Sequence, residues 1–271
     1  MKTPKNPFKT SGKRRTVTDL LNIMARLRGP SGCPWDREQT EQTLKKFLIE
    51  EAYETLEAIE AGSPETLKEE LGDLLFQIVF QSQIAKENKE FDMPDIIDKI
   101  AKKMVSRHPH VFGNTTCSTS AEVVAQWEVQ KKREGKLRES ILEGVPATLP
   151  SLLRAHRLQK RAAGVGFDWE RVEDVLKKLD EEVKEFKEAL GTKNKDMIED
   201  ELGDIFFMLV NIARFIGVNP EDAHRKTISK FIRRFRYIEM KAAEQGRKLS
   251  DMALDEMDKL WDEAKGKEAK G

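Results

Sequence analysis

An acidic pattern spread over two adjoining helices occurs twice in this 271-residue sequence and restricts its fold more than any other feature. Each copy has three glutamates within five residues, then a break, and then a Glu-x-x-Asp sequence. The first copy holds Glu50, Glu51, Glu54, Glu70 and Asp73, and the second holds Glu181, Glu182, Glu185, Glu201 and Asp204. Every matched pair is 131 positions apart, as in 182 − 51 and 204 − 73, so the chain contains a tandem repeat.

The spacing within each copy predicts that the acidic residues meet. Residues three or four apart share one face of an α-helix, so the acidic residues of each helix project together. The midpoint between the two pairs is Gly62 in the first copy, in a Gly-Ser-Pro break. In the second copy it is Lys193, inside the break Gly191–Asn194. An antiparallel helical hairpin would therefore place the acidic pairs opposite each other in both copies.

Carboxylates that converge between two helices repel one another unless a cation neutralises them. Hard divalent cations are the usual solution, and Mg²⁺ also binds substrate phosphates, which suits the hydrolysis of phosphoanhydrides. The alternative is a solvated charged face of a helix. Apolar neighbours argue against it, because they put the carboxylates at the edge of a core, where uncompensated charge is costly. These neighbours are Leu71, Leu74, Leu75, Leu202, Ile205 and Phe206.

Apolar residues recur at helical spacing and no stretch alternates as a strand would, so the sequence predicts an all-α fold. We expect two tandem helical-bundle units, each built around an acidic hairpin. Helices are expected over 17–28, 38–61, 65–88, 95–107 and 121–134, and, beside the second hairpin, over 152–163, 221–244 and 251–264. The predicted organisation is a flexible tail (1–16), a first domain (17–140), a linker (141–151), a second domain (152–265) and a disordered tail (266–271).

The charge balance limits the partners expected for the chain. Its 48 basic and 48 acidic residues cancel, which removes the general electrostatic attraction for nucleic acid, so no nucleic-acid partner is expected. No run of about 18 apolar residues occurs, so no membrane span is expected. The basic N-terminal sequence lacks the apolar core of a signal peptide, and Cys33 and Cys117 form no Cys-x-x-Cys pair. A cytoplasmic location is therefore predicted.

These patterns together resemble the MazG family of nucleoside triphosphate pyrophosphohydrolases. The sequences that carry the resemblance are EExxE followed by ExxD across a hairpin, GCPWD before it and HPHVFG after it. The resemblance extends from Val17 to Lys265 and implies helical bundles that pair as a homodimer. It implies Mg²⁺-dependent hydrolysis of the α–β bond, with Mn²⁺ as a substitute cation, and broad base preference among ribo- and deoxynucleoside triphosphates. A house-cleaning role in the nucleotide pool and a link to toxin–antitoxin or stringent-response systems are further implications.

The resemblance also implies roles for individual residues. The metal ligands would be Glu182, Glu185, Glu201 and Asp204 in the second copy and Glu51, Glu54, Glu70 and Asp73 in the first. Nucleotide contacts would come from Lys178, Lys230, Arg233, Arg234 and Trp261. The cations would offset phosphate charge and the indole would stack on a base, whereas the alternatives are a solvated basic face and a core anchor. The catalytic candidates are Glu181, as general base or supporting group, and Glu182.

The second copy is predicted to be the main catalytic unit. Phe47 stands where the second copy has Lys178, so the first copy is more apolar beside its carboxylates. Lys103 and Trp127 are the first copy's candidates for nucleotide contacts. The first copy is therefore expected to be weaker, differently selective or largely structural.

Two other interpretations stay open from the sequence. One is a dedicated pyrophosphatase of the same all-α group, against which the tandem duplication argues. The other is a nucleotide-sensing or partner-binding helical scaffold without turnover, which would have little need for two complete sets of carboxylates. Among the remaining polar residues, Asp36 and Asp168 are expected to cap the helices that follow, and His108 and His110 to have a structural role in a loop.

Overall fold

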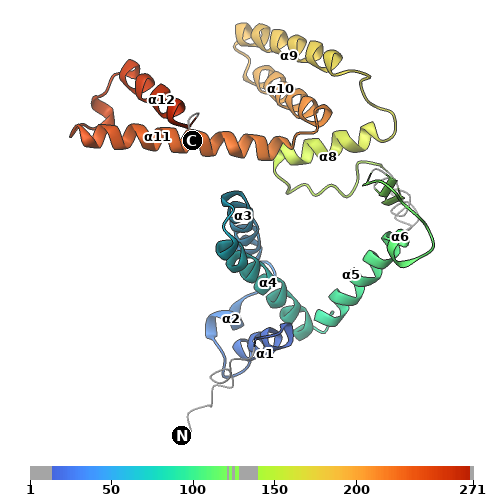
Figure 1. Ribbon diagram of the computed structural model, residues 1–271. Coiled ribbons are helices and arrows are strands. Elements are labelled where there is room, and N and C mark those ends of the chain that lie inside the picture. Colours follow the sequence, from blue (N-terminus) through green and yellow to red (C-terminus); the bar gives the residue numbers. More distant parts are fainter. Residues whose placement is uncertain (1–13, 121, 124–125, 128–139, 269–271) are drawn as a thin grey trace. The chain divides into compact units, whose positions relative to one another are not determined.

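The computed structural model describes residues 14–120, 122–123, 126–127 and 140–268, and every regular element in those ranges is helical (Figure 1). The chain divides into two compact units, residues 1–136 (unit 1) and 137–271 (unit 2). Each unit contains one of the acidic hairpins as a pair of long packed helices. The predicted all-α fold with two repeated units is therefore confirmed.

Unit 1 is organised around the pair α3–α4, with α1 and α5 packed on α4. Its helices are α1 (Val17–Leu27), α2 (Pro34–Glu38), α3 (Lys45–Ala61), α4 (Pro64–Glu87), α5 (Met93–Arg107) and α6 (Pro109–Phe112). The buried core consists of Met24, Leu44, Val79, Phe80, Ile84 and Met93, with Phe47 and Phe76 packed against it. These positions recur at helical spacing, so the same periodicity that buries one face of α4 leaves another face for its acidic residues.

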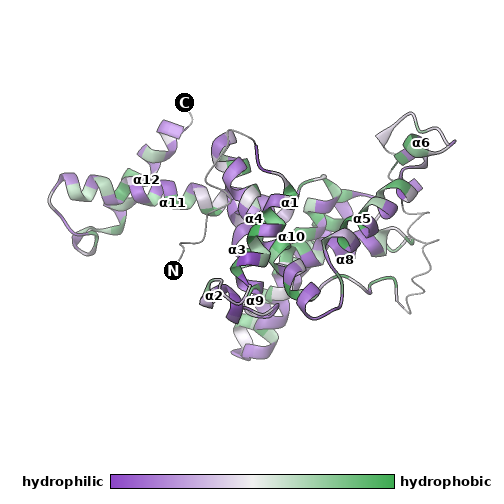
Figure 2. Cartoon of the chain, turned by 90° about the horizontal axis from the view of Figure 1, so that it is seen from below, coloured by the Kyte–Doolittle hydropathy of each residue, from purple (hydrophilic) through white to green (hydrophobic). Residues whose placement is uncertain are grey.

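Unit 2 repeats the hairpin as α9–α10, with α8 packed on α10, and adds a second pair formed by α11 and α12. Its helices are α8 (Ser151–Ala163), α9 (Val172–Thr192), α10 (Lys195–Phe215), α11 (Pro220–Glu244), the 3₁₀ turn η1 (Leu249–Asp251) and α12 (Leu254–Glu268). Figure 2 shows hydrophobic and hydrophilic residues interleaved along the helices of both units. This interleaving is the amphipathic pattern that the sequence predicts.

The turns of the two hairpins use the same backbone geometry with different residues. Gly62 ends α3 in the left-handed conformation (φ +64°), and the Ser63 hydroxyl then accepts a hydrogen bond from the Thr66 amide to start α4. In unit 2 the left-handed residue is Lys193 (φ +58°), and Asn194 caps α10. Gly191, which the sequence suggested as part of the turn, lies inside α9. In both hairpins the residue with positive φ is the predicted midpoint, Gly62 or Lys193.

Several predicted boundaries differ from the structure. The helix expected over 38–61 begins only at Lys45, as α3, because residues 39–44 form a non-helical connection from α2. Helix α12 continues to Glu268, so residues 266–268 are helical rather than part of a disordered tail, because Glu268 is held by ion pairs from α11. The segment predicted as a linker carries hydrogen bonds from Arg161 to the carbonyls of Ile141 and Glu143, within unit 2. The helix expected over 121–134 lies mostly outside the described residues, and the domain bounds stay predictions.

The capping roles expected for Asp36 and Asp168 are wrong. Asp36 lies buried within α2, and the cap of the following helix α3 is Leu44. Asp168 forms an ion pair with Arg214, while α9 begins after Arg171 without a side-chain cap. Both aspartates precede a helix in the sequence, but tertiary contacts rather than the helix end determine where each side chain lies.

Candidate metal centres

The unit 1 centre is formed by Glu51 on α3 with Glu70 and Asp73 on α4 (the cluster of unit 1). One carboxylate oxygen from each residue lies within 4.8 Å of the others. Glu54, one turn after Glu51, lies outside this group of three but is near enough for its charge to raise the pKa of both Glu51 and Glu70. The helical spacing and the antiparallel turn therefore bring the acidic residues together as predicted.

Glu51 and Glu70 of this cluster both have a raised pKa. Burial raises the pKa of Glu51 above its ordinary value, and the charges of Asp73, Glu54 and Glu70 raise it further. Burial also raises the pKa of Glu70, followed by the charges of Glu54 and Asp73. Mutual repulsion of this kind means that a bound cation would stabilise the ionised cluster.

Two buried polar residues that the sequence analysis did not select support the unit 1 cluster. The hydroxyl of Thr55 donates to the Glu51 carbonyl at 2.7 Å and lies 3.4 Å from the Glu70 carbonyl, which joins α3 to α4. The side-chain amide of Gln77 hydrogen-bonds to the Glu51 carboxylate and partly offsets the rise in its pKa. Gln77 follows Asp73 by four residues, so its place on the acidic face of α4 was available from the helical period.

The unit 2 centre repeats this arrangement with Glu182 on α9 and Glu201 and Asp204 on α10 (the cluster of unit 2). Their carboxylate oxygens again lie within 4.8 Å of one another, and Glu182 is buried. Burial raises the pKa of Glu201, followed by the charges of Glu185 and Glu182. Burial and the Glu182 charge likewise raise the pKa of Asp204.

Lys178 distinguishes the cluster of unit 2 from that of unit 1. Its Nζ lies 3.0 Å from Glu182 Oε1 and 3.2 Å from Glu181 Oε2. These hydrogen bonds raise the pKa of Lys178, and its positive charge opposes the rise in the pKa of Asp204. The lysine predicted to contact phosphates therefore lies beside the acidic cluster, on the same helix face as Glu182.

The other predicted nucleotide-binding residues lie on the second helix pair of unit 2. Arg233 and Arg234 on α11 both form ion pairs with Glu268 on α12, at 3.2 Å and 2.8 Å. The Trp261 ring on α12 lies beside Phe231, with centroids 5.4 Å apart, and the Arg234 guanidinium is 5.5 Å from its centre. These described contacts are all within the α11–α12 pair, and none joins the acidic residues of α9 and α10. Lys230 is exposed on α11.

The histidines near the end of α5 contact neighbouring groups within unit 1. His108 Nδ1 lies 2.6 Å from the Met104 carbonyl, and its ring meets the edge of Trp127 at 5.1 Å. His110 Nδ1 and Cys117 Sγ each lie 3.2 Å from the Gln126 side-chain oxygen. The groups with metal-binding spacing among the described residues are the two acidic clusters, and neither includes a histidine.

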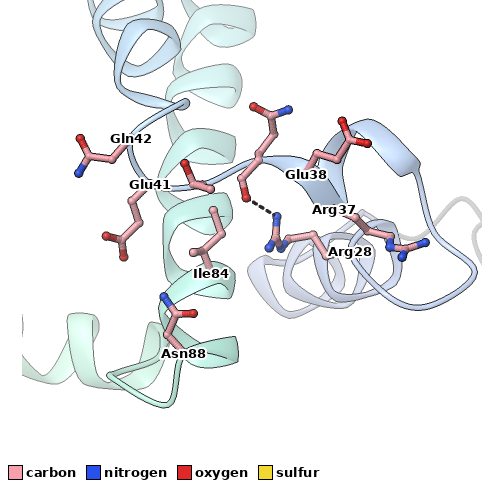
Figure 3. Close-up of a pocket in the computed structure, with 9 residues that line it drawn as sticks. Arg28, Arg37, Glu38, Glu41, Gln42, Ile84 and Asn88 are labelled. Atoms are coloured by element: carbon pink, nitrogen blue, oxygen red, sulfur yellow. Dashed lines mark hydrogen bonds between the residues drawn. The ribbon is translucent and has the colours of Figure 1, made fainter.

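A separate polar pocket of about 350 Å³ lies between the α2–α3 connection and the end of α4 (Figure 3). Arg28 donates to the carbonyls of Asp36 and Gln39 and forms an ion pair with Glu87 at 2.7 Å. Glu38 and Glu41 also line the pocket, so its positive and negative charges are mixed. Because Arg28 already contacts acceptors of the protein, we interpret the pocket as a structural connection between α1, the α2–α3 loop and α4.

The donor sets of both clusters fit a hard divalent cation. Carboxylate oxygens are the ligands that Mg²⁺ and similar ions prefer, and each cluster presents three of them from two rigid helices. Burial and neighbouring carboxylates raise the pKa of Glu51 and Glu201, so a cation would stabilise their ionised forms. Fold and sites together define an all-α protein with two candidate divalent-cation centres. No described helix is both long and apolar enough to cross a membrane.

Comparisons with known proteins place the chain in a family. A model described as the MazG nucleotide pyrophosphohydrolase domain matches residues 39–112 and 170–238. The chain is 42% identical to the nucleoside triphosphate pyrophosphohydrolase/pyrophosphatase MazG of Thermotoga maritima, over 92% of this chain and 95% of that protein. It is also 42% identical to the nucleoside triphosphate pyrophosphohydrolase of Escherichia coli K12, over 93% of this chain and 98% of that protein. The chain therefore belongs to the MazG nucleotide pyrophosphohydrolase family.

A further relative is the uncharacterized protein YabN of Bacillus subtilis, which is 49% identical over 90% of this chain and 50% of its own length. The two matched segments of the family model each contain one acidic hairpin. The repeat found in the sequence is thus a repeat of the family's domain.

Proposed function

We propose that this protein is a Mg²⁺-dependent nucleoside triphosphate pyrophosphohydrolase that cuts between the α- and β-phosphates. The products are a nucleoside monophosphate and pyrophosphate. The observation that carries the proposal is the convergence of Glu182, Glu201 and Asp204 beside Lys178, in a chain of the MazG family. Mn²⁺, which accepts similar oxygen ligands, is expected to substitute for Mg²⁺.

The chemistry divides between the cation and the side chains of unit 2. When bound by Glu182, Glu185, Glu201 and Asp204, Mg²⁺ supplies charge that offsets the charge on phosphate oxygens. Lys178 provides a further positive charge at the same cluster. Glu181 is exposed and lies against Lys178, so its carboxylate can accept the proton of an attacking water, with Glu182 as the other candidate base.

The proposed reaction is a displacement at the α-phosphorus. The water oxygen forms a bond to this phosphorus while the carboxylate takes the proton. The bond from the α-phosphorus to the bridging oxygen breaks, and pyrophosphate leaves with the bonding electrons. No side chain of the cluster needs to contact the base, which favours broad base preference among ribo- and deoxynucleotides and a house-cleaning role in the nucleotide pool.

Unit 1 is proposed to contribute less turnover than unit 2. Its four corresponding ligands are Glu51, Glu54, Glu70 and Asp73, but Phe47 replaces the lysine and packs on the core of unit 1. Without the positive charge of a lysine at this position, unit 1 offers less compensation for the phosphates of a bound nucleotide. A weaker or differently selective site follows.

A homodimer is proposed as the active form, because unit 2 leaves large apolar side chains exposed. They include Leu202, Phe206, Phe207 and Leu209 on α10 and Ile228, Phe231 and Ile232 on α11. Apolar surface on this scale is typical of an interface between proteins. A second copy that covers it could also bring its own α11–α12 pair to the acidic cluster, which would put Lys230, Arg233, Arg234 and Trp261 near the nucleotide.

Product analysis with purified protein tests this function. ATP, dATP and dUTP are incubated with Mg²⁺, with Mn²⁺, or with a chelator, and the nucleotide products are separated by ion-exchange chromatography. We expect monophosphate and pyrophosphate in equal amounts, with no turnover under chelation. Diphosphate plus orthophosphate would contradict cleavage at the α–β bond. Nucleotide binding without any product would favour the sensing or scaffold role.

A further inference from the structure

The two acidic clusters have matching carboxylates, but different residues contact the glutamate of the first helix in each hairpin, which is half-buried Glu51 in unit 1 and buried Glu182 in unit 2. In unit 2 the Lys178 ammonium lies 3.0 Å from Glu182. At the matching position, unit 1 has Phe47, which packs on the hydrophobic core and lies edge-on to Trp35 with centroids 5.8 Å apart. Glu51 instead receives a hydrogen bond from the neutral amide of Gln77. The position of Gln77 is taken in unit 2 by Met208, which is equally buried.

This exchange leaves the clusters with different charge. Three carboxylates meet in each hairpin, but among the described residues only the unit 2 cluster has a lysine ion-paired with one of them, Lys178 with Glu182. The neighbouring charges that act on Glu51 and Glu70 are those of other carboxylates. Unit 1 therefore presents a more negative site to an incoming cation.

Gln77 adds an observation that points to a ligand at unit 1. The residue is 7% exposed, and its side-chain oxygen is buried with no hydrogen-bond partner among the described residues. Buried polar atoms are normally satisfied, so an unpartnered oxygen on the side chain that hydrogen-bonds to Glu51 favours a bound cation or its water. The helical spacing places Gln77 on the same face of α4 as Glu70 and Asp73.

We propose that the cluster of unit 1 takes up a free divalent cation, whereas the cluster of unit 2 takes up its cation together with a polyphosphate. In unit 2 a cation must displace Lys178 from Glu182, and a phosphate chain gives the displaced ammonium a new partner. In unit 1 no such exchange is required, and Gln77 holds Glu51 in place as a positioning residue. The inference rests on the proposed function for the identity of the cation.

Titration of the full chain with Mn²⁺ in the absence of nucleotide, followed by electron paramagnetic resonance of the free ion, tests this difference. We expect two affinity classes about tenfold apart, which corresponds to a difference of about 1.4 kcal/mol in binding free energy. Glu51→Gln should remove the tighter class, and Glu182→Gln the weaker one. Adding α,β-methylene-ATP should tighten the weaker class selectively.

Substitutions at the positions that differ between the two clusters test the inference more sharply. Lys178→Met should tighten the weaker class toward the affinity of the other, and Gln77→Met, which copies the residue of unit 2, should weaken the tighter class. Lys177→Met is the matched control, because Lys177 pairs with Asp174 at 3.2 Å and not with the cluster. It should leave both classes unchanged.

A single affinity class, or loss of the tighter class in Glu182→Gln, would overturn the inference. Either result alongside normal, cation-dependent pyrophosphate release would leave the proposed function standing. Two classes with the expected variant pattern but no turnover would support the inference and contradict the proposed function. Absence of Mn²⁺ binding to the wild-type chain without nucleotide would overturn the inference, and its absence with α,β-methylene-ATP as well would also contradict the proposed function.

Discussion

The two acidic hairpins agree in the three carboxylates that form each candidate cation centre and differ in the side chains beside them. Glu51, Glu70 and Asp73 in unit 1 have the same mutual spacing as Glu182, Glu201 and Asp204 in unit 2. Beside these carboxylates, however, the matching positions of the repeat hold different residues: Phe47 corresponds to Lys178, and Gln77 corresponds to Met208. The two hairpins thus have the same candidate cation ligands with a different charge beside them. On the proposed function, unit 1 would bind a cation and contribute less turnover than unit 2.

Among the single substitutions at positions that differ between the two hairpins, Lys178→Met should have the largest effect on catalysis. Lys178→Met removes the positive charge beside Glu182, and kcat/KM for ATP should fall about 10- to 100-fold, as expected when a phosphate-binding cation is lost. Steady-state release of pyrophosphate measures this effect.

Two companion variants make the Lys178 result specific. Phe47→Met, at the matching position in unit 1, and Lys177→Met, which removes a charge one residue away, should each change kcat/KM by less than about threefold. An equal loss in Lys177→Met would show that the general charge of α9 matters rather than the contact with Glu182.

The exchange of turn residues should produce a smaller change, in stability. Gly62 and Lys193 occupy the same left-handed backbone conformation, which costs about 1 kcal/mol for a residue with a Cβ atom. Gly62→Lys should therefore lower the free energy of unfolding by about 1 kcal/mol, and Lys193→Gly should raise it by up to about 1 kcal/mol.

Urea denaturation of the two turn variants, monitored by circular dichroism, checks these values. No atom lies within 4 Å of a Cβ built on Gly62, so the expected cost comes from the backbone and not from a clash. If both substitutions destabilised the protein equally, the turn conformation would not be the cause.

His156 on α8 should make unit 2 slightly more sensitive to acid than unit 1, which has Ala25 at the matching position. Burial lowers the pKa of His156, and the positive charges of Lys160, Arg214 and Arg157 lower it further. As pH falls through the ordinary value of 6.5, the unfolded chain takes up a proton that the folded protein resists. Stability from this residue is therefore present above that pH and lost below it.

Thermal unfolding at pH 7.5 and 5.5 measures the His156 contribution. The difference in Tm between the two pH values should shrink in His156→Gln, which keeps a polar side chain but does not titrate in this range. His224→Gln, which replaces a histidine on α11 of the same unit, is the control and should retain the wild-type difference. An unchanged difference in His156→Gln would remove this residue from the explanation.

The carboxylate clusters were predictable because they depend on local rules. Helical period fixes the face shared by Glu70 and Asp73, and the midpoint rule located the turns at Gly62 and Lys193. These rules operate within one hairpin, so no knowledge of the remaining fold was needed.

Features that depend on tertiary partners were not predictable in the same way. Asp168 was expected to cap a helix, but Arg214, 46 residues later, holds it. Glu268 was expected in a disordered tail, yet Arg233 and Arg234 keep it helical. The role of Gln77 was missed because a neutral amide gives no charge signal in the sequence, and its importance comes from its burial beside Glu51.

Paired isosteric substitutions test most directly whether unit 2 carries most of the turnover. Glu182→Gln and Glu51→Gln each remove one charge from matching positions of the two clusters while conserving side-chain volume. Pyrophosphate release from ATP with saturating Mg²⁺ should fall at least about 100-fold in Glu182→Gln and by less than about threefold in Glu51→Gln. Equal losses in the two variants, or a larger loss in Glu51→Gln, would contradict the assignment of catalysis to unit 2.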